Sequence, residues 1–155
     1  MNLIGVLLVN YCFIITLSTA SEKSTVQDFQ SNGIELIITN IRNNKGLIQI
    51  GMYESDKGYP DKPEVSFSLS KDSLVSGKLK FFIPLKKKGT FAFSILDDEN
   101  RNEKMDYRLG IIPKEGFGFS NNPKIRGMKE PPFEVTSFQY TGGREIVTVK
   151  MIYML

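Results

Sequence analysis

The 155-residue sequence contains no histidine, and its single cysteine, Cys12, lies in an apolar N-terminal stretch. These two absences exclude histidine triads, histidine metal sites, cysteine nucleophiles and redox cysteine pairs from the folded domain. Charge is nearly balanced: 20 Lys and Arg stand against 17 Asp and Glu, which leaves a formal net charge of +3. Nucleic-acid binding depends on clustered basic faces, so this small surplus predicts no nucleic-acid partner.

The N-terminal segment has the pattern of a secretory signal peptide. Residues 1–20 contain no Asp, Glu, Lys or Arg, and the apolar run ends in Ser18, Thr19 and Ala20. Small residues before a polar stretch are typical of a cleavage site, here after Ala20. The alternative is an uncleaved anchor, but a membrane span takes about 20 consecutive apolar residues. We therefore expect export to the periplasm or the cell exterior, with no membrane-spanning segment left after cleavage.

Beyond a polar, aperiodic leader at residues 21–33, the chain alternates between short strand patterns and turn residues. Seven strands are expected, at residues 34–40, 47–54, 65–70, 79–83, 90–96, 133–140 and 145–152. The first two are expected to form one hairpin, and the last two another, because Asn- and Gly-rich turns separate them. This pattern predicts an all-β, seven-stranded two-sheet sandwich of immunoglobulin-like or transthyretin-like type at residues 34–153. One long loop, residues 97–132, interrupts it.

The second expected strand shows which side faces the core. Ile48, Ile50 and Met52 are uniformly apolar, whereas Leu47, Gln49, Gly51 and Tyr53 on the other side are mixed. Because successive strand side chains point to opposite faces, we expect the first set in the core and the second set outside it.

Acidic and amide side chains crowd residues 97–106. Counting from Asp98, side-chain oxygens fall at positions one, three, five and nine, which are Asp98, Asn100, Asn102 and Asp106. Calcium ions take about six to eight oxygen ligands, and alternate positions of a tight loop can turn several of them inward. The opening half therefore matches a calcium-binding loop of EF-hand type.

The second half of that match fails. Position six is Glu103 where the motif has Gly, and position twelve is Leu109 where it has a bidentate Glu. Two interpretations stay open. One is a looser Ca²⁺ site completed by Asp97, Glu115 or water; the other is a solvated loop whose side chains bond their own backbone.

Residues 110–123 alternate glycine with phenylalanine before a run of polar residues. The alternation lets the backbone pass close to another segment while Phe117 and Phe119 anchor it. One interpretation is a loop held over one end of the sandwich by these two rings. The other is a ligand-binding surface, since long loops on rigid sandwiches often carry function. Its members would be Glu115, Phe117, Phe119, Ser120 and Asn121.

Several of these motifs resemble one bacterial family. The resemblance is carried by LDDENRNEKMD, GIIPKEGFGFSNNP, YESDKGYPDKPE and FEVTSFQYTGGREIVTVKM, across about residues 34–152. They resemble an exported family catalogued as domain of unknown function 2141. The resemblance implies a small all-β sandwich behind a signal peptide, with no established reaction.

The family pattern falls on several candidate residues of this chain. These are Asp98, Glu99, Asn100, Asn102, Asp106, residues 113–118, Ser120 and Asn121. Three departures stand out: the family usually has Gly at Glu103, often has His at Asp97, and looks one residue shorter around residues 111–112. The first departure weakens a tight cation loop, while the second adds a charge that partly compensates.

Three functions from different classes follow. The first is a non-catalytic exported module that binds Ca²⁺ at residues 97–106. The second is an envelope module that binds carbohydrate or peptide, with Tyr59, Tyr107, Phe117 and Phe119 as stacking platforms. The third is a glycoside hydrolase built on Asp97, Asp98, Asp106 and Glu115. The third is disfavoured, because a sandwich this small offers little cleft.

Overall fold

The computed structural model of the protein describes residues 32–127 and 129–154. This part of the chain is all-β, with ten strands and a single short helix, α2. The predicted signal peptide at residues 1–20 lies outside the described residues, as do residues 21–31 of the predicted leader. The leader ends earlier than predicted, because Gly33 already begins the first strand.

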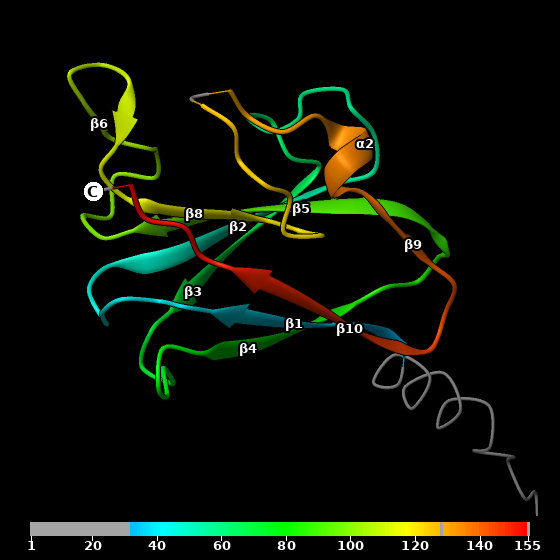
Figure 1. Cartoon of the computed structure of the whole chain (residues 1–155). Coiled ribbons are helices and arrows are strands. Elements are labelled where there is room, and N and C mark those ends of the chain that lie inside the picture. The colour runs from blue at the N-terminus through cyan, green and yellow to red at the C-terminus, as the bar shows by residue number, and fades with distance from the viewer. Residues whose placement is uncertain (1–31, 128, 155) are drawn as a thin grey trace, which may run out of the picture.

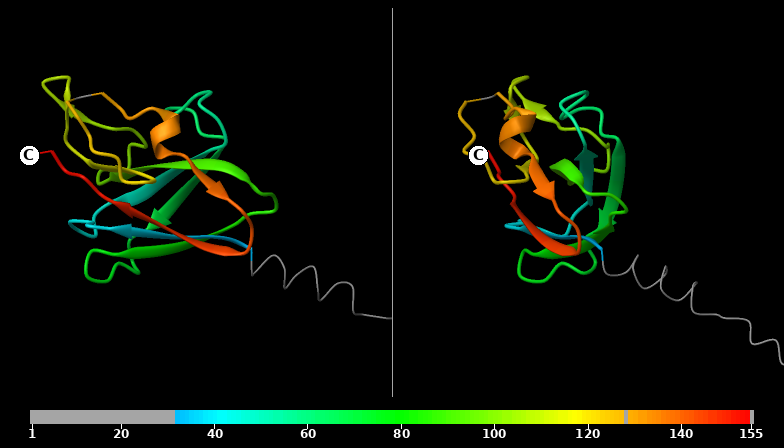
Figure 2. Two further views of the ribbon diagram at one scale, coloured as in Figure 1. Left: turned by 45° about the vertical axis from the view of Figure 1, so that its right-hand side comes forward. Right: turned by 90° about the vertical axis from the view of Figure 1, so that its right-hand side faces the viewer.

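The strands form two main layers (Figures 1 and 2). The first sheet has the order β10 (Arg144–Lys150), β1 (Gly33–Thr39) and β4 (Leu79–Pro84). The second has the order β3 (Val65–Ser70), β2 (Leu47–Tyr53), β5 (Gly89–Asp98) and β8 (Gly116–Phe119). The fifth strand of this second sheet, β9 (Phe138–Tyr140), pairs with the first residues of β5.

The remaining elements lie on the side of the second sheet that faces away from the first. They are α2 (Phe133–Thr136) and a hairpin of β6 (Tyr107–Arg108) and β7 (Ile112–Pro113). Figure 1 shows both above β5 and β8, with the first sheet on the opposite side. The long segment predicted as one loop is thus partly ordered into three short strands and covers one face of a sheet.

The core lies between the two sheets. It is formed by alternate side chains of β1, β2 and β5, all of them nearly or fully inaccessible to water: Ile34, Leu36, Ile38, Ile48, Ile50, Met52, Phe91, Phe93 and Ile95. Burying one such side chain contributes about 1.5–3 kcal/mol, so this layer dominates the stability of the fold. The predicted core face of the second strand is confirmed.

Several details of the seven-strand prediction were wrong. The described residues form ten strands, and residues 133–136 form one helical turn instead of a strand. Neither predicted hairpin forms: β1 pairs in parallel with β10, whereas β2 pairs with β3 and β5, and β9 pairs with β5. Turn residues show where the chain changes direction, but strand partners depend on apolar faces brought together from distant parts of the chain.

The glycine–phenylalanine strand β8 packs closely against the C-terminal segment. Phe117 and Ile152 exchange two backbone hydrogen bonds, of 3.0 and 2.7 Å, which join the second sheet to the end of β10. A methyl group at Gly118 would lie 2.7 Å from Cγ1 of Val149, and one at Gly116 would lie 2.3 Å from the Tyr153 ring. The close approach that the alternating glycines predicted is therefore present, and the segment approached is residues 149–153.

We expect Gly118→Ala to lower the free energy of unfolding by about 1–3 kcal/mol, because the added methyl group overpacks the contact with Val149. Gly89→Ala is the matched control: it lies in β5, and its added methyl group would meet only the Phe91 ring, at 3.7 Å. The control should leave stability unchanged or raise it by up to about 1 kcal/mol. Urea denaturation measures both, and equal effects would contradict the packing assignment.

Candidate functional site

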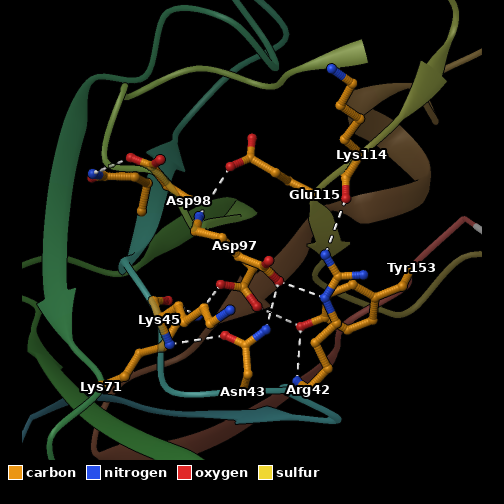
Figure 3. A network of polar contacts seen from close by, with 11 residues as sticks. Arg42, Asn43, Lys45, Lys71, Asp97, Asp98, Lys114, Glu115 and Tyr153 are labelled. Atoms are coloured by element: carbon orange, nitrogen blue, oxygen red, sulfur yellow. Dashed lines mark hydrogen bonds and ion pairs between the residues drawn. The ribbon is translucent and has the colours of Figure 1, made fainter. Parts of the chain in front are cut away.

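A buried ion pair lies where β3 and β5 end (Figure 3). Lys71, only 3% exposed, donates from Nζ to Oδ1 of the fully buried Asp97 and to the Lys45 carbonyl oxygen at 2.6 Å. The Tyr153 hydroxyl donates to the other oxygen of Asp97 at 2.6 Å. Burial, and then the bond to Asp97, raise the pKa of Tyr153 well above its usual range. Asp97, predicted as an extra metal ligand, is thus occupied on both oxygens by this chain's own donors.

Arg42 connects this network to residues 97–106, the acidic loop (Figure 3). Its guanidinium lies over the Tyr153 ring, 4.6 Å from the centroid. Its Nε donates to Glu99 at 2.5 Å, and its terminal nitrogen to the Lys114 carbonyl at 3.2 Å. The hydrogen bond from Arg42 is the main reason that the pKa of Glu99 lies below its ordinary value. Four chain segments distant in sequence are held together here.

The first half of the acidic loop bonds its own backbone. The two carboxylate oxygens of the buried Asp98 accept the Asn102 and Glu103 N–H groups at 3.0 and 2.9 Å. The amide oxygens of Asn100 and Asn102 accept N–H groups two residues further on, at 3.1 Å each. These are the side-chain turns of the solvated-loop interpretation. Glu103 has a φ of 62°, so it takes the left-handed conformation that a glycine would take at this position.

The second half of the loop closes on Asp106 and Glu115. Asp106 accepts the side-chain amides of Asn100 and Asn102 at 2.6 and 3.2 Å. Glu115 accepts the Glu99 and Asp106 N–H groups at 3.0 and 3.2 Å, and so connects the two ends of the loop. Burial raises the pKa of Glu115, and the nearby carboxylates of Asp98 and Asp106 raise it further.

These hydrogen bonds thus bring Glu115 together with the four predicted ligands, Asp98, Asn100, Asn102 and Asp106. Across residues 32–127 and 129–154, however, no group of three or more Asp, Glu, His or Cys side chains is placed to hold a metal ion. A cation here would depend on amide oxygens, backbone carbonyls and water as well as carboxylates.

The predicted ligand surface divides into two groups. Ser120 is fully buried: its hydroxyl accepts the Phe93 N–H at 2.8 Å and donates to the Thr136 carbonyl at 2.6 Å. The exposed Asn121 donates its amide to the Ser137 carbonyl at 2.6 Å. These residues attach the end of β8 to α2, which supports the interpretation of this part as an anchored loop.

The two phenylalanines belong to an aromatic cluster on the outer face of the second sheet. Its members are Tyr53, Tyr59, Phe117, Phe119 and Phe133, in contact at centroid distances of 4.9–6.2 Å. Tyr53 was predicted to lie outside the core, yet it is buried, because this cluster forms a second, smaller core. The Tyr59 hydroxyl is buried without a hydrogen-bond partner in the described part of the chain, and burial raises its pKa to about 12.

Beside this cluster is a cleft of about 530 Å³. Its floor is formed by outward-facing residues of three neighbouring strands, in register across the sheet: Gln49 and Gly51 of β2, Ser66 and Ser68 of β3, and Ser94 and Leu96 of β5. One wall comes from residues 103–105, the exposed Tyr107, Ile111 and Pro113, and another from Ile125, Gly127 and residues 129–131.

The sequence alone did not predict this cleft. Ser66, Ser68 and Gln49 have the pattern of an ordinary solvent face, and only the register of the sheet shows that they lie together. The available signal was the serines at alternate positions of β3, Ser66, Ser68 and Ser70, combined with a long segment able to cover that face.

Comparison with protein families shows which family the chain matches. The family model for uncharacterized proteins conserved in bacteria, DUF2141, matches residues 36–148. The chain belongs to this family. The DUF2141 match runs from β1 into β10 and includes the acidic loop, both walls of the cleft, and Lys71 and Asp97 of the buried pair. Comparison with curated proteins and with solved structures finds no match. No helix in the described part of this DUF2141 chain is long and apolar enough to cross a membrane.

We expect Lys71→Met to lower the free energy of unfolding by about 3–5 kcal/mol, because it leaves the Asp97 carboxylate buried without its cation. The matched control is Lys87→Met, which breaks the exposed Lys87–Glu54 pair of 2.6 Å. Exposed pairs contribute about 0–1 kcal/mol, so the control should change little. Urea denaturation measures both, and a loss below about 1 kcal/mol for Lys71→Met would show that the buried pair does not stabilise the fold.

Proposed function

We propose that the protein is an exported, non-catalytic binding module of the bacterial envelope. In this proposal an immunoglobulin-like or transthyretin-like sandwich carries a carbohydrate in the cleft on its second sheet. The supporting observation is the combination of an uncharged, mostly polar floor, in which Leu96 is the apolar member, with aromatic and proline side chains around it. The cleft volume falls in the range of about 300–1,000 Å³ that is common for small-ligand sites.

The chemistry of the lining favours a carbohydrate. Sugars present hydroxyl groups at their edges and C–H groups on their faces. Ser66 offers a hydroxyl group to the sugar hydroxyls. Ser68 donates to Gln49 and Gln49 donates to Asp98, so these two residues offer their remaining lone pairs and amide N–H. The rings of Tyr107 and Phe117 offer stacking surfaces to the C–H faces. Acidic and basic residues on the rim nearly balance, which suits a neutral ligand; they are Asp61, Glu103, Glu130, Lys104 and Lys129.

A peptide fits this cleft less well. Extended peptides gain most of their affinity by adding a strand to a free sheet edge. The cleft lies over the face of the sheet, where β2 is already paired on both sides, with β3 and β5. The floor therefore offers side chains rather than unpaired backbone groups.

Hydrolysis is not part of the proposal, because the predicted carboxylates are engaged elsewhere. Asp97 is paired with Lys71, while Asp98 and Glu115 are buried and accept backbone N–H groups. A glycoside hydrolase needs two carboxyl groups that flank the sugar bond.

Ligand binding in the cleft can be tested with a substitution that fills its floor. We expect a screen on an array of bacterial envelope glycans to give at least one ligand, and Ser66→Leu to weaken its binding by more than tenfold in calorimetry. The control is Ser70→Leu, on the same exposed side of β3 but outside the cleft. Absence of any glycan ligand, or equal losses in both variants, would contradict the proposal; binding to a peptide array alone would favour the other ligand class.

A second candidate function is Ca²⁺ binding by the acidic loop. The observation in its favour is the left-handed φ of Glu103, which removes the objection that only glycine could make the turn at position six. An amide or carboxylate oxygen that accepts one N–H retains a further lone pair for a cation. With two loop carboxylates, Asp98 and Asp106, such a site would be in the weak range of extracellular modules, with a Kd of about 0.1–1 mM.

Calcium binding by the loop can be tested by thermal unfolding. At about 10 mM Ca²⁺, a site with a Kd of about 1 mM stabilises the fold by about 1.4 kcal/mol, which raises Tm by about 3 °C or more. Asp106→Asn should abolish the increase, whereas Asp72→Asn, an exposed acid in another turn, should retain it. If Tm is the same in Ca²⁺ and in chelator, the loop does not bind this ion.

A further inference from the structure

The hairpin of β6 and β7 carries an apolar tip. Leu109 is 85% exposed and Ile111 is 59% exposed, and Tyr107 beside them is 46% exposed. These are three of the seven large apolar side chains that are exposed within the described chain, and they lie within five residues. Figure 1 shows the hairpin extending away from both sheets.

Folding does not account for a leucine at this tip. Leu109 has a φ of 53°, a left-handed conformation that glycine and asparagine adopt more readily than leucine. At 85% exposure its side chain also gains almost no burial. Asparagine at this position would suit both the backbone and solubility better, so neither backbone preference nor burial within the described chain accounts for this leucine.

Exposed cationic side chains occur on both sides of the tip in the sequence. Arg101, Lys104, Arg108 and Lys114 are all exposed, and none makes an ion pair within residues 32–127 and 129–154. Among residues 101–114 these four exposed cations stand against one exposed acid, Glu103, while the half-buried Asp106 accepts the amides of Asn100 and Asn102. The tip therefore combines two protruding apolar side chains with nearby cations that are free to bind an anionic surface.

We infer that the β6–β7 hairpin docks the protein on an anionic lipid surface, with Leu109 and Ile111 inserted among the lipids. Shallow insertion of a few apolar residues with flanking cations is sufficient at a bilayer surface, where long basic side chains reach the headgroups. A stable protein partner needs about 800 Å² from each side, which a protruding tip of two or three residues does not offer. The inference is independent of the carbohydrate proposal, although Tyr107 and Ile111 also line the cleft and docking would bring its rim near the membrane.

The test uses tryptophan as a position-specific reporter, because the chain contains none. Leu109→Trp is prepared in the full chain, with Val75→Trp as its control; Val75 is a 70% exposed residue in the connection between β3 and β4. Both variants are mixed with phosphatidylcholine vesicles, with and without phosphatidylglycerol. We expect the emission of Leu109→Trp to shift to shorter wavelength and to be quenched by brominated lipid when phosphatidylglycerol is present, while Val75→Trp does not change.

Because both variants share the same N-terminus, any membrane binding by residues 1–20 is common to them and cannot produce the difference. Equal behaviour of the two reporters, or no shift with either lipid, would overturn the inference.

A second pair of variants guards against a perturbing effect of tryptophan itself. Leu109→Asn should lower the partition into anionic vesicles at least tenfold while Tm stays the same or rises, since asparagine accepts the left-handed conformation. Arg108→Gln should lower the partition about fivefold, the effect of one cation near an anionic surface. If Leu109→Asn partitions as the unaltered chain does, the hairpin is not the docking element and the inference fails.

Discussion

The interaction on which the arrangement of this protein depends is the ion pair between Lys71 and Asp97, out of contact with water. A buried carboxylate is tolerated only where donors surround it, and here Lys71 and Tyr153 supply them. Lys71 follows β3, Asp97 ends β5 and Tyr153 belongs to the C-terminal segment. The bonds to the single carboxylate of Asp97 therefore hold three distant parts of the chain together.

The same C-terminal residues also position the long segment that follows β5. The Phe117–Ile152 backbone pairing holds β8 against the same C-terminal residues, and Glu115 connects the two ends of the acidic loop just before β8. The acidic and amide side chains thus act first as internal acceptors that shape the loop. Whether or not a cation adds to this, the loop is placed so that the residues following it form a wall of the cleft.

The hairpin between this loop and β8 links the two proposals. Its inner side chains line the cleft, and its tip carries the exposed leucine. Gln49 of the cleft floor also donates to Asp98 at 3.4 Å, so the floor contacts the acidic loop directly. A ligand in the cleft, a cation in the loop and a lipid surface at the tip would all act on the same short stretch of chain, and each would favour its ordered form.

The sequence by itself determined the properties that act over a few residues. Alternation in β2 identified its core face, and glycine alternation in β8 identified a close backbone approach. The oxygen pattern at residues 98–106 identified a loop that either bonds itself or binds a cation. All of these depend on local geometry, in which the strand period of two and the turn preferences of Gly, Asn and Asp decide the outcome.

Only the tertiary structure decided which strands pair, why Tyr53 is buried and where the cleft lies. β1 lies beside β10, more than one hundred residues further along the chain, and the cleft floor combines side chains from three strands. Such juxtapositions result from joint burial of apolar faces and from the register between strands. No short stretch of sequence contains that information, because its physical origin is the packing of the whole chain.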